Sequence, residues 1–297
     1  MPPVCLITGA TGYVGSRLAR ALMGWGWTVH AVVRRMAPLP AGVTAHLHDG
    51  TTEGLGSLLE RVRPEVVLHL AAVTTAQHRQ ADVTPMVEAN LLFATQLLEA
   101  MARHGVTRLV NTGSFWQHHD NRDYGPVNLY AATKQAFEEI VTYYVEAFGM
   151  RAITLHLSNT YGPDDPRRML FALLAGLKSD SPQLAMSPGE QKIDLIHIDD
   201  VTSAFRVAAE RLLAGQGIGH ERFAVSSGQA VRIKDLVRMI EDCTGRRLPV
   251  LWGGRPYHPR EMMQPWDKGE RLPGWSPEVS LAEGIVRSLP DDPKIDR

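Results

Sequence analysis

Apolar residues along the first half of the chain follow two alternating spacings. Short runs rich in β-branched residues are bounded by glycine and polar residues, a pattern typical of buried strands. Between them lie longer stretches in which apolar residues recur at the spacing of one helix face. We predict strands over residues 4–8, 28–34, 43–48, 65–70, 108–112 and 152–157, and helices over residues 13–23, 86–104 and 129–148.

Strands that alternate with helices predict an α/β fold of the Rossmann type, with a doubly wound parallel sheet. After about residue 160 the pattern loosens, and prolines and glycines crowd residues 161–166, 182–189 and 253–265. We therefore expect residues 1–160 to form mainly a dinucleotide-binding domain. Residues 161–297 are expected to form mainly a smaller C-terminal substrate-binding lobe, with part of this stretch returning to the main sheet.

Composition limits the classes of partner. The 297 residues carry a formal net charge of −1, with 44% hydrophobic and 21% charged residues. This balance supplies no electrostatic attraction for nucleic acid or an anionic membrane, so we expect neither as a partner. Cys5 and Cys243 are far apart and lack metal-ligand spacing, so no metal site is predicted. The N-terminus shows no signal-peptide pattern and no segment is apolar over the length of a bilayer, so we expect a cytoplasmic protein.

A glycine-rich turn, Gly-Ala-Thr-Gly-Tyr-Val-Gly, connects the first predicted strand to the first predicted helix. A glycine triplet alone also fits a turn of no function, but the strand before it and the helix after it favour a dinucleotide site. The first glycine permits the tight turn, the second lets backbone approach a pyrophosphate, and the third allows close helix–strand packing. The predicted cofactor contacts in this turn are Gly9, Thr11, Gly12, Tyr13, Val14 and Gly15.

The residues after the second predicted strand bear on the choice of cofactor. An acidic residue there usually holds the ribose 2′-hydroxyl of NAD, whereas arginine accommodates the 2′-phosphate of NADP. The strand ends with Arg34 and is followed by Arg35, with no acidic residue nearby. Two guanidinium groups suit a phosphate dianion, although two solvated surface arginines are the simpler alternative. The sequence favours NADPH and leaves NADH open.

A tyrosine and a lysine four residues apart open the last long helix of the first half. Tyr130 and Lys134 share one helix face, where the ammonium favours the phenolate and so lowers the tyrosine pKa. An ordinary surface pair has the same spacing. Ser114, however, follows the fifth predicted strand at the carboxyl edge of the sheet, where ligands bind in such folds. We predict that Ser114, Tyr130 and Lys134 are the catalytic residues.

These motifs together resemble the extended short-chain dehydrogenase/reductase family, also called the NAD-dependent epimerase/dehydratase family. The resemblance rests on the turn at residues 8–15, Leu70-Ala71-Ala72, Asn90, Ser114 and the Tyr130/Lys134 pair. It continues through Ser-Asn-Thr-Tyr-Gly-Pro at 158–163, Asp-Leu-Ile-His-Ile-Asp-Asp-Val at 194–201 and Leu-Pro-Gly-Trp-Ser-Pro at 272–277. It spans nearly the whole chain.

The resemblance implies a role for each matching residue. Tyr130 is implied as the general acid/base, Lys134 as its pKa modulator and a ribose ligand, and Ser114 as the partner of the substrate oxygen. Asn90 is implied as a cofactor contact near the active site, with a buried structural amide as the alternative. The resemblance further implies a homodimer through the two long helices. The remaining implied cofactor contacts are Asp49 and Gly50 at the adenine, and Leu70, Ala71 and Ala72 along the cofactor.

Most members of the extended family act on nucleotide-linked sugars, which implies such a substrate here. Arginines after residue 253 are candidate diphosphate ligands because guanidinium matches phosphate oxygens, with a solvated basic loop as the alternative. His118 and His119 lie between Ser114 and Tyr130 and are candidates for sugar contact, or are simply polar loop residues. The predicted substrate contacts are His118, Asn159, Gln191, Arg255 and Arg260.

The stretch after the fifth predicted strand bears on the reaction. Dehydratases of the family carry Thr-Asp-Glu there, whereas residues 112–116 are Thr-Gly-Ser-Phe-Trp, which argues against dehydration. Residues 113–118 and 126–130 resemble bacterial reductases of nucleotide-linked 4-keto-6-deoxyhexoses, such as CDP-abequose and CDP-paratose synthases. We predict NADPH-dependent reduction of a sugar C4 ketone. An NAD-dependent nucleotide-sugar epimerase and a non-catalytic NADP-sensing protein are the alternatives.

Overall fold

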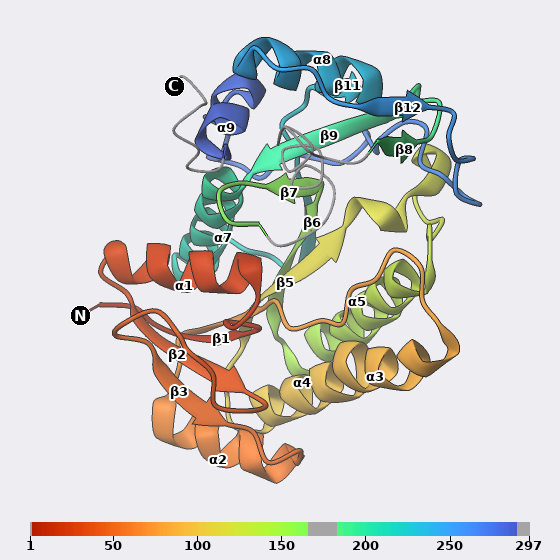
Figure 1. The fold of residues 1–297 in the computed structure, drawn as a ribbon. Coiled ribbons are helices and arrows are strands. Elements are labelled where there is room, and N and C mark those ends of the chain that lie inside the picture. Colours follow the sequence, from red (N-terminus) through yellow and green to blue (C-terminus); the bar gives the residue numbers. More distant parts are fainter. Residues whose placement is uncertain (1, 166–182, 290–297) are drawn as a thin grey trace.

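A seven-stranded parallel sheet forms the centre of the molecule (Figure 1). The computed structural model describes residues 2–165 and 183–289. The strand order, β3-β2-β1-β4-β5-β6-β10, changes direction between β1 and β4, and ligands of such sheets bind at the carboxyl ends beside this switch point. The predicted Rossmann-type fold is confirmed. The strands are β1 Val4–Thr8, β2 Thr28–Val33, β3 Thr44–Leu47, β4 Val66–His69, β5 Arg108–Ser114, β6 Arg151–Leu157 and β10 His220–Val225.

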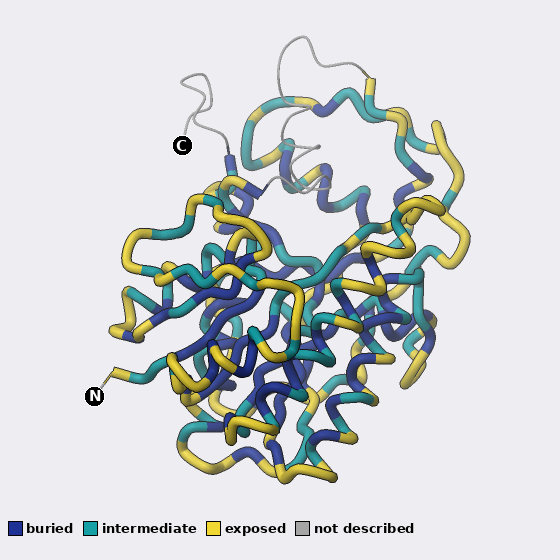
Figure 2. The backbone as a smooth tube through the Cα atoms, turned by 90° about the horizontal axis from the view of Figure 1, so that it is seen from below, coloured by how far each residue is buried: buried dark blue, intermediate teal, exposed yellow. Residues whose placement is uncertain are grey.

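Helices cover both faces of the sheet because both faces of its strands are apolar. In β1, Cys5 and Ile7 belong to one core cluster with side chains of α1 (Tyr13–Gly24) and α7 (Ile198–Leu213). Leu6 points to the opposite face and shares a second cluster with α2 (Thr52–Val62), α4 (Phe93–Arg103) and α5 (Leu129–Phe148). Figure 2 shows the result, with buried backbone through the centre and exposed backbone around the rim.

The helix predicted over residues 86–104 differs from the observed one. It begins earlier, as α3 (Val83–Val87), passes through a π-helical turn, η2 (Glu88–Leu92), and continues as α4. A π turn is rare and frequently marks a functional site. Here it contains Asn90, which is buried and hydrogen-bonded to two other segments.

The helix α2 was not predicted. Two glycines, Gly54 and Gly56, lower its intrinsic helix propensity by about 1 kcal/mol each. Burial of Leu55, Leu58 and Leu59 on one face outweighs this cost, and the Thr51 side chain caps the first turn by accepting from the Gly54 amide at 2.9 Å.

The C-terminal lobe begins where β6 ends. Its three-stranded sheet has the order β11-β9-β7, a two-stranded sheet pairs β12 with β8, and its helices cover them (Figure 1). Tyr161, Leu195, Leu236 and Ile285 are buried in its core. In residues 2–165 and 183–289, no helix has the length and apolarity needed to cross a membrane. The lobe elements are β7 Asn159–Tyr161, β8 Leu184–Met186, β9 Lys192–His197, β11 Ala230–Arg232, α8 Ile233–Thr244, β12 Val250–Trp252 and α9 Leu281–Arg287.

Candidate active site

The glycine-rich turn lies between β1 and α1, as the sequence indicates. Gly9 has φ +76°, a conformation that favours glycine, and a Cβ there would lie 2.7 Å from the Ala71 amide nitrogen. At Gly15 a Cβ would lie 2.1 Å from the Gly9 carbonyl oxygen, so helix and turn touch through backbone alone. Gly12 is exposed, and a Cβ there would approach only the Gly9 oxygen, at 3.3 Å. The open side of the turn therefore fits a pyrophosphate at the helix N-terminus.

The first turn of α1 carries no acidic residue that would repel an anion. Gly12 is the N-cap and has no side chain to occupy the free amide groups of that turn. Thr11 is exposed beside it, whereas Tyr13 and Val14 are half-buried and Tyr13 donates from its hydroxyl to the Pro163 carbonyl at 3.2 Å. The turn is thus tied to the start of the C-terminal lobe.

Two arginines follow β2 at the same edge of the sheet. Thr8 is paired with Val32, so Arg34 and Arg35 lie just beyond the glycine-rich turn. Both are exposed, and in the described part of the chain neither takes part in an ion pair. Asp49, after β3, is exposed and accepts from the Thr51 amide at 2.9 Å.

The segment after β4 passes close to the turn. The hydroxyl of Thr8 accepts hydrogen bonds from the amides of Leu70 (3.2 Å) and Ala71 (3.1 Å). Leu70, Ala71 and Ala72 are half-buried, and the Leu70–Ala71 backbone lies so close to Gly9 that a Cβ there would meet it. Gly50 follows β3, and its carbonyl accepts from Gln96 Nε2 of α4 at 3.2 Å.

Ser114 is the last residue of β5. Its backbone amide donates to Gln117 Oε1 at 2.9 Å, and its hydroxyl accepts from the Trp116 amide at 3.2 Å. These bonds fix the short helix η3 (Phe115–Gln117) that follows the strand. Trp116 in turn packs edge-on against the ring of Tyr130, with centroids 6.1 Å apart. Strand β5 and helix α5 therefore bring Ser114 and Tyr130 to one region.

Tyr130 and Lys134 lie in the first turns of α5. Asn128 caps this helix by accepting from the Ala131 amide at 3.0 Å, which sets where the helix begins. Both side chains are buried, and Lys134 Nζ lies 5.9 Å from the centroid of the Tyr130 ring. Burial lowers the pKa of Lys134 to about 8, and the carboxylate of Glu138 partly opposes this shift.

Asn90 connects the π turn to the start of α5. Its side-chain oxygen accepts from the Val73 amide at 2.8 Å, and its nitrogen donates to the Val73 carbonyl at 3.1 Å and to Thr133 Oγ1 at 2.9 Å. All the polar atoms of this amide are thus engaged within the protein. Asn90, an expected cofactor contact, holds the segment after β4 and the start of α5 in place.

The five candidate substrate residues are not equally free. Both ring nitrogens of His118 are engaged within the protein, and the ring is 4% exposed and stacked on Trp266. It therefore offers a substrate no free nitrogen. Arg260 donates from Nε to the Pro126 carbonyl at 2.9 Å, which leaves its terminal nitrogens for other partners.

The other candidates lie in the lobe. Asn159 Nδ2 donates to the Asp194 carbonyl at 3.3 Å. Gln191 Nε2 donates to Ser187 Oγ at 2.8 Å. Arg255 is exposed, and its backbone amide donates to the Met186 carbonyl at 3.2 Å.

The late motifs join the lobe to the main sheet. Trp275 Nε1 donates to the Asp200 carbonyl at 3.1 Å, and the Asp200 carboxylate accepts from the amides of Glu278 and Val279. Gly284 is packed so closely that a Cβ would lie 1.9 Å from the Tyr161 hydroxyl oxygen. These motif residues hold structure together rather than carry chemistry.

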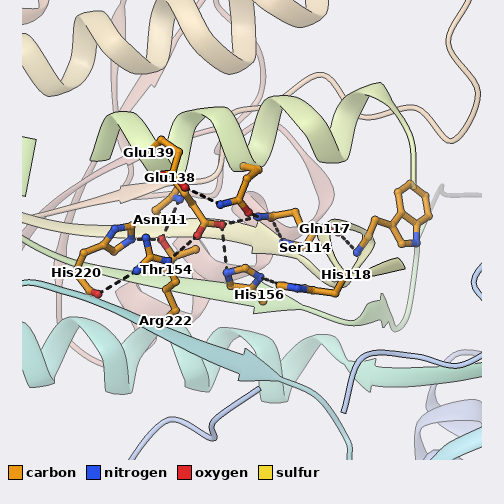
Figure 3. A network of polar contacts seen from close by, with 12 residues as sticks. Asn111, Ser114, Gln117, His118, Glu138, Glu139, Thr154, His156, His220 and Arg222 are labelled. Atoms are coloured by element: carbon orange, nitrogen blue, oxygen red, sulfur yellow. Dashed lines mark hydrogen bonds and ion pairs between the residues drawn. The ribbon is translucent and has the colours of Figure 1, made fainter. Parts of the chain in front are cut away.

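A buried polar cluster beneath Ser114 was not predicted. Glu138 is 1% exposed and contacts His156 (3.2 Å), Gln117 (2.7 Å) and Arg222 (3.1 Å) (Figure 3). Burial alone raises the pKa of Glu138, but the opposing effects of His156 and Gln117 prevail and hold it at about 2. The sequence feature that points to this cluster is the spacing in α5, because Glu138 follows Lys134 by one helical turn.

Known proteins are similar to this chain over nearly its whole length. A CDP-abequose synthase from Salmonella muenchen is 25% identical over 288 residues, covering 96% of this chain and 96% of that protein. A UDP-glucose 4-epimerase from Mycolicibacterium smegmatis is 27% identical over 320 aligned positions, covering 96% of each. The structure of Bacillus cereus UDP-glucuronic acid 4-epimerase, in complex with UDP-glucuronic acid and NAD, has the same fold (TM-score 0.83, 24% identity, 96% of this chain and 98% of that one). Residues 5–220 match the NAD dependent epimerase/dehydratase family, and the chain therefore belongs to that family.

Proposed function

We propose that this protein reduces the C4 ketone of a nucleotide-linked 4-keto-6-deoxy sugar with NADPH. The observation that carries the proposal is the arrangement of Tyr130, Lys134 and Ser114 beside the glycine-rich turn. A phenol, a buried ammonium and a hydroxyl at that edge supply what carbonyl reduction needs besides a hydride. The similarity to a CDP-abequose synthase over nearly the whole chain supports a nucleotide sugar as substrate.

The chain's own residues handle the proton and the substrate oxygen. The bound nicotinamide supplies the hydride, which becomes the new C–H bond at C4. Tyr130 donates its proton to the oxygen as negative charge develops there, and water restores that proton. The Lys134 ammonium stabilises the resulting phenolate, and Ser114 Oγ hydrogen-bonds the same substrate oxygen. Ketone, hydride and proton together give the alcohol.

NADPH is preferred in this proposal because of Arg34 and Arg35. Both guanidinium groups are exposed beside the turn, and no acidic residue ends β2 to hold a ribose hydroxyl. The Bacillus cereus structure is a complex with NAD, so the preference is a property proposed for this chain's arginines. Guanidinium pairs recognise phosphate through two parallel hydrogen bonds.

Epimerisation is the second candidate, favoured by the 27% identity to a UDP-glucose 4-epimerase. An epimerase returns the hydride it removes, so it consumes no cofactor. The test is to follow NADPH absorbance with a panel of 4-keto sugar nucleotides, and to analyse UDP-glucose incubated with NAD. We expect NADPH oxidation matched by sugar reduction. Interconversion of UDP-glucose without net oxidation would favour the epimerase, and tight binding without turnover of either would favour a non-catalytic sensor.

We also propose that two copies pair through the long helices. Apolar side chains on the outer surfaces of α3, η2 and α5 are 37% to 58% exposed: Val83, Val87, Leu92, Tyr143 and Phe148. Light scattering is expected to give twice the chain mass of 32.8 kDa, and a species of 32.8 kDa would overturn this pairing.

A further inference from the structure

Two connections run side by side from the main sheet into the C-terminal lobe. Strand β6 ends at Leu157 and β10 at Val225, and these two residues are partners in the sheet. The Ser158 amide donates to the Val225 carbonyl at 3.0 Å, so the two strands remain bonded where they end. The chain then enters the lobe as β7 after the first strand and as β11 after the second. We call residue 158, before β7, and residues 226–229, before β11, the two crossings.

Strand β9 receives both crossings, because it lies between β11 and β7 in the lobe sheet (Figure 1). Asp194 of β9 is paired with Ala230, the first residue of β11. The next residue, Leu195, is paired with Asn159, the first residue of β7. Asp194 is 2% exposed, so its carboxylate is enclosed at the point where the lobe joins the main sheet.

The Asp194 carboxylate binds both crossings. Its Oδ1 accepts from Ser158 Oγ at 2.7 Å and from the Ser227 amide at 3.0 Å, so a single oxygen joins the two connections. Its Oδ2 accepts from the hydroxyls of Ser226 and Ser227 and from the Gly228 amide, each at 3.0 Å. Five neutral donors thus satisfy a charge that would be costly to bury without partners.

The two backbone donors make this arrangement specific for a carboxylate. The Ser227 amide donates to Oδ1 and the Gly228 amide to Oδ2, and a backbone N–H group cannot accept a hydrogen bond. An asparagine side chain would set its NH2 group against one of these amides in either orientation. Removal of the charge at Asp194 therefore breaks at least one contact with the crossing before β11.

Asp194 also contacts a residue of the proposed substrate site. Its carbonyl accepts from Asn159 Nδ2 at 3.3 Å, and Asn159 directly follows the crossing at Ser158. Asn159, Gln191 and Arg255 are proposed substrate contacts in the lobe, whereas the proposed catalytic residues lie on β5 and α5. A sugar nucleotide held by the lobe meets the catalytic residues only if the lobe keeps one orientation on the main sheet.

We propose that Asp194 fixes the orientation of the C-terminal lobe on the main sheet and so places the sugar beside the proposed catalytic residues. It is a positioning residue, because it acts through the two crossings. The fixed orientation rests on the contacts of the carboxylate, whereas the effect on the sugar also rests on the proposed function.

The orientation is tested by measuring the distance between two spin labels, one on α2 and one on α8. The labels are attached through Ser57→Cys and Arg238→Cys, both at exposed positions, in a chain that carries Cys243→Ser and retains the buried Cys5. Dilution into unlabelled protein removes distances between copies. We expect a narrow distance distribution with Asp194 present and a broader or displaced one for Asp194→Asn. Identical distributions overturn the proposal, and this measurement needs no substrate.

Kinetics distinguishes a displaced lobe from a loss of folded protein. A smaller folded fraction lowers kcat and leaves KM unchanged, whereas a displaced lobe is expected to raise the KM for the sugar nucleotide by about 10- to 100-fold. NADPH affinity should stay unchanged, because its proposed site lies on the main sheet. Wild-type KM in folded Asp194→Asn protein overturns the role in placing the sugar. If wild type reduces no 4-keto sugar, the proposed function fails and the label distances alone decide the role of Asp194.

Two further variants complete the test. Ser158→Ala removes one contact with the carboxylate and is expected to change the label distances in the same way but by less, so the proposal can be tested even if Asp194→Asn does not fold. Glu241→Gln is the matched control, because its carboxylate accepts from the Leu248 amide at 2.9 Å and both residues lie within the lobe. It is expected to keep wild-type label distances and KM. A change as large as that of Asp194→Asn would overturn the assignment to the crossings.

Discussion

Asn90 Nδ2 donates to Thr133 Oγ1 at 2.9 Å, which joins the π turn of one long helix to the second turn of another. Thr133 Oγ1 in turn donates to the Tyr130 carbonyl at 2.7 Å. The same Asn90 amide holds Val73, in the segment that follows β4. One buried side chain therefore sets the position of the Tyr130 backbone against the edge of the sheet where we propose that the cofactor binds.

The proposed proton donor is tested by Tyr130→Phe. Loss of the phenol removes the proton source and is expected to lower kcat by about 100- to 10,000-fold, with NADPH affinity little changed. Steady-state kinetics and fluorescence titration of NADPH measure the two effects. Tyr143→Phe is the control, because that side chain lies in the same helix and is 58% exposed. A Tyr130→Phe enzyme within a few-fold of wild type would refute the role.

Alanine substitutions at two positions of the glycine-rich turn are expected to have different effects, one on stability and one on dinucleotide binding. Gly15→Ala places a methyl 2.1 Å from the Gly9 oxygen, and we expect a loss of about 1–3 kcal/mol in the free energy of unfolding. Gly12→Ala meets only one atom, at 3.3 Å, so it should leave stability nearly unchanged and weaken dinucleotide binding instead.

Urea unfolding and calorimetric titration separate the two effects. Gly24→Ala is the control in the same helix, with no atom near the added methyl, and should be neutral or slightly stabilising. Equal stability of Gly15→Ala and wild type would contradict the close packing of helix and turn.

The arginines after β2 predict a cofactor preference. Replacing Arg34 and Arg35 together by alanine is expected to weaken NADPH binding by about 10- to 100-fold, because hydrogen bonds to charged groups contribute about 1.5–3 kcal/mol. Affinity for NADH should be nearly unchanged, since it lacks the 2′-phosphate. If wild type binds NADH more tightly than NADPH, the preference is wrong.

Acid is expected to destabilise the fold because two buried histidines, His69 and His118, and one half-buried histidine, His220, are neutral rings. Burial lowers the pKa of His69 to about 3, of His118 to about 4 and of His220 to about 3. Below pH 6.5 the unfolded chain takes up protons that the folded chain does not, so stability is complete above pH 6.5 and falls as the pH drops.

The expected loss is about 2 kcal/mol per histidine at pH 5. Urea unfolding at pH 7.5, 6 and 5 measures this loss. His220→Gln should reduce the total loss in the free energy of unfolding over this pH range by about one third. His78→Gln, at an exposed position, should leave it unchanged. Stability independent of pH between 7.5 and 5 would contradict the buried neutral state.

Sequence patterns predicted the first half of the fold well because its strands are short β-branched runs between amphipathic helices. The helix α5 was predicted at its observed bounds, Leu129–Phe148. The π turn was missed because it depends on contacts between Asn90 and residues far away in the sequence. Strand β10 was not located because it opens with the polar residues His220, Glu221 and Arg222.

The buried polar cluster beneath Ser114 escaped prediction for a related reason. Glu138, His156 and His118 meet only when β6 lies beside β5 and α5 packs across both strands. His118 was predicted to touch substrate, but the register of those strands places its ring on His156 and beneath Trp266. Spacing identifies residues on one helix face and gives no information on partners from other strands.

Isotope transfer tests the central claim most directly. The protein is incubated with a 4-keto-6-deoxy sugar nucleotide and NADPH that carries deuterium at the transferable position of the nicotinamide, and the product is analysed by NMR. We predict one deuterium at C4 of the sugar for each NADPH oxidised. Epimerised sugar nucleotide without deuterium, with NADPH unconsumed, would contradict reduction.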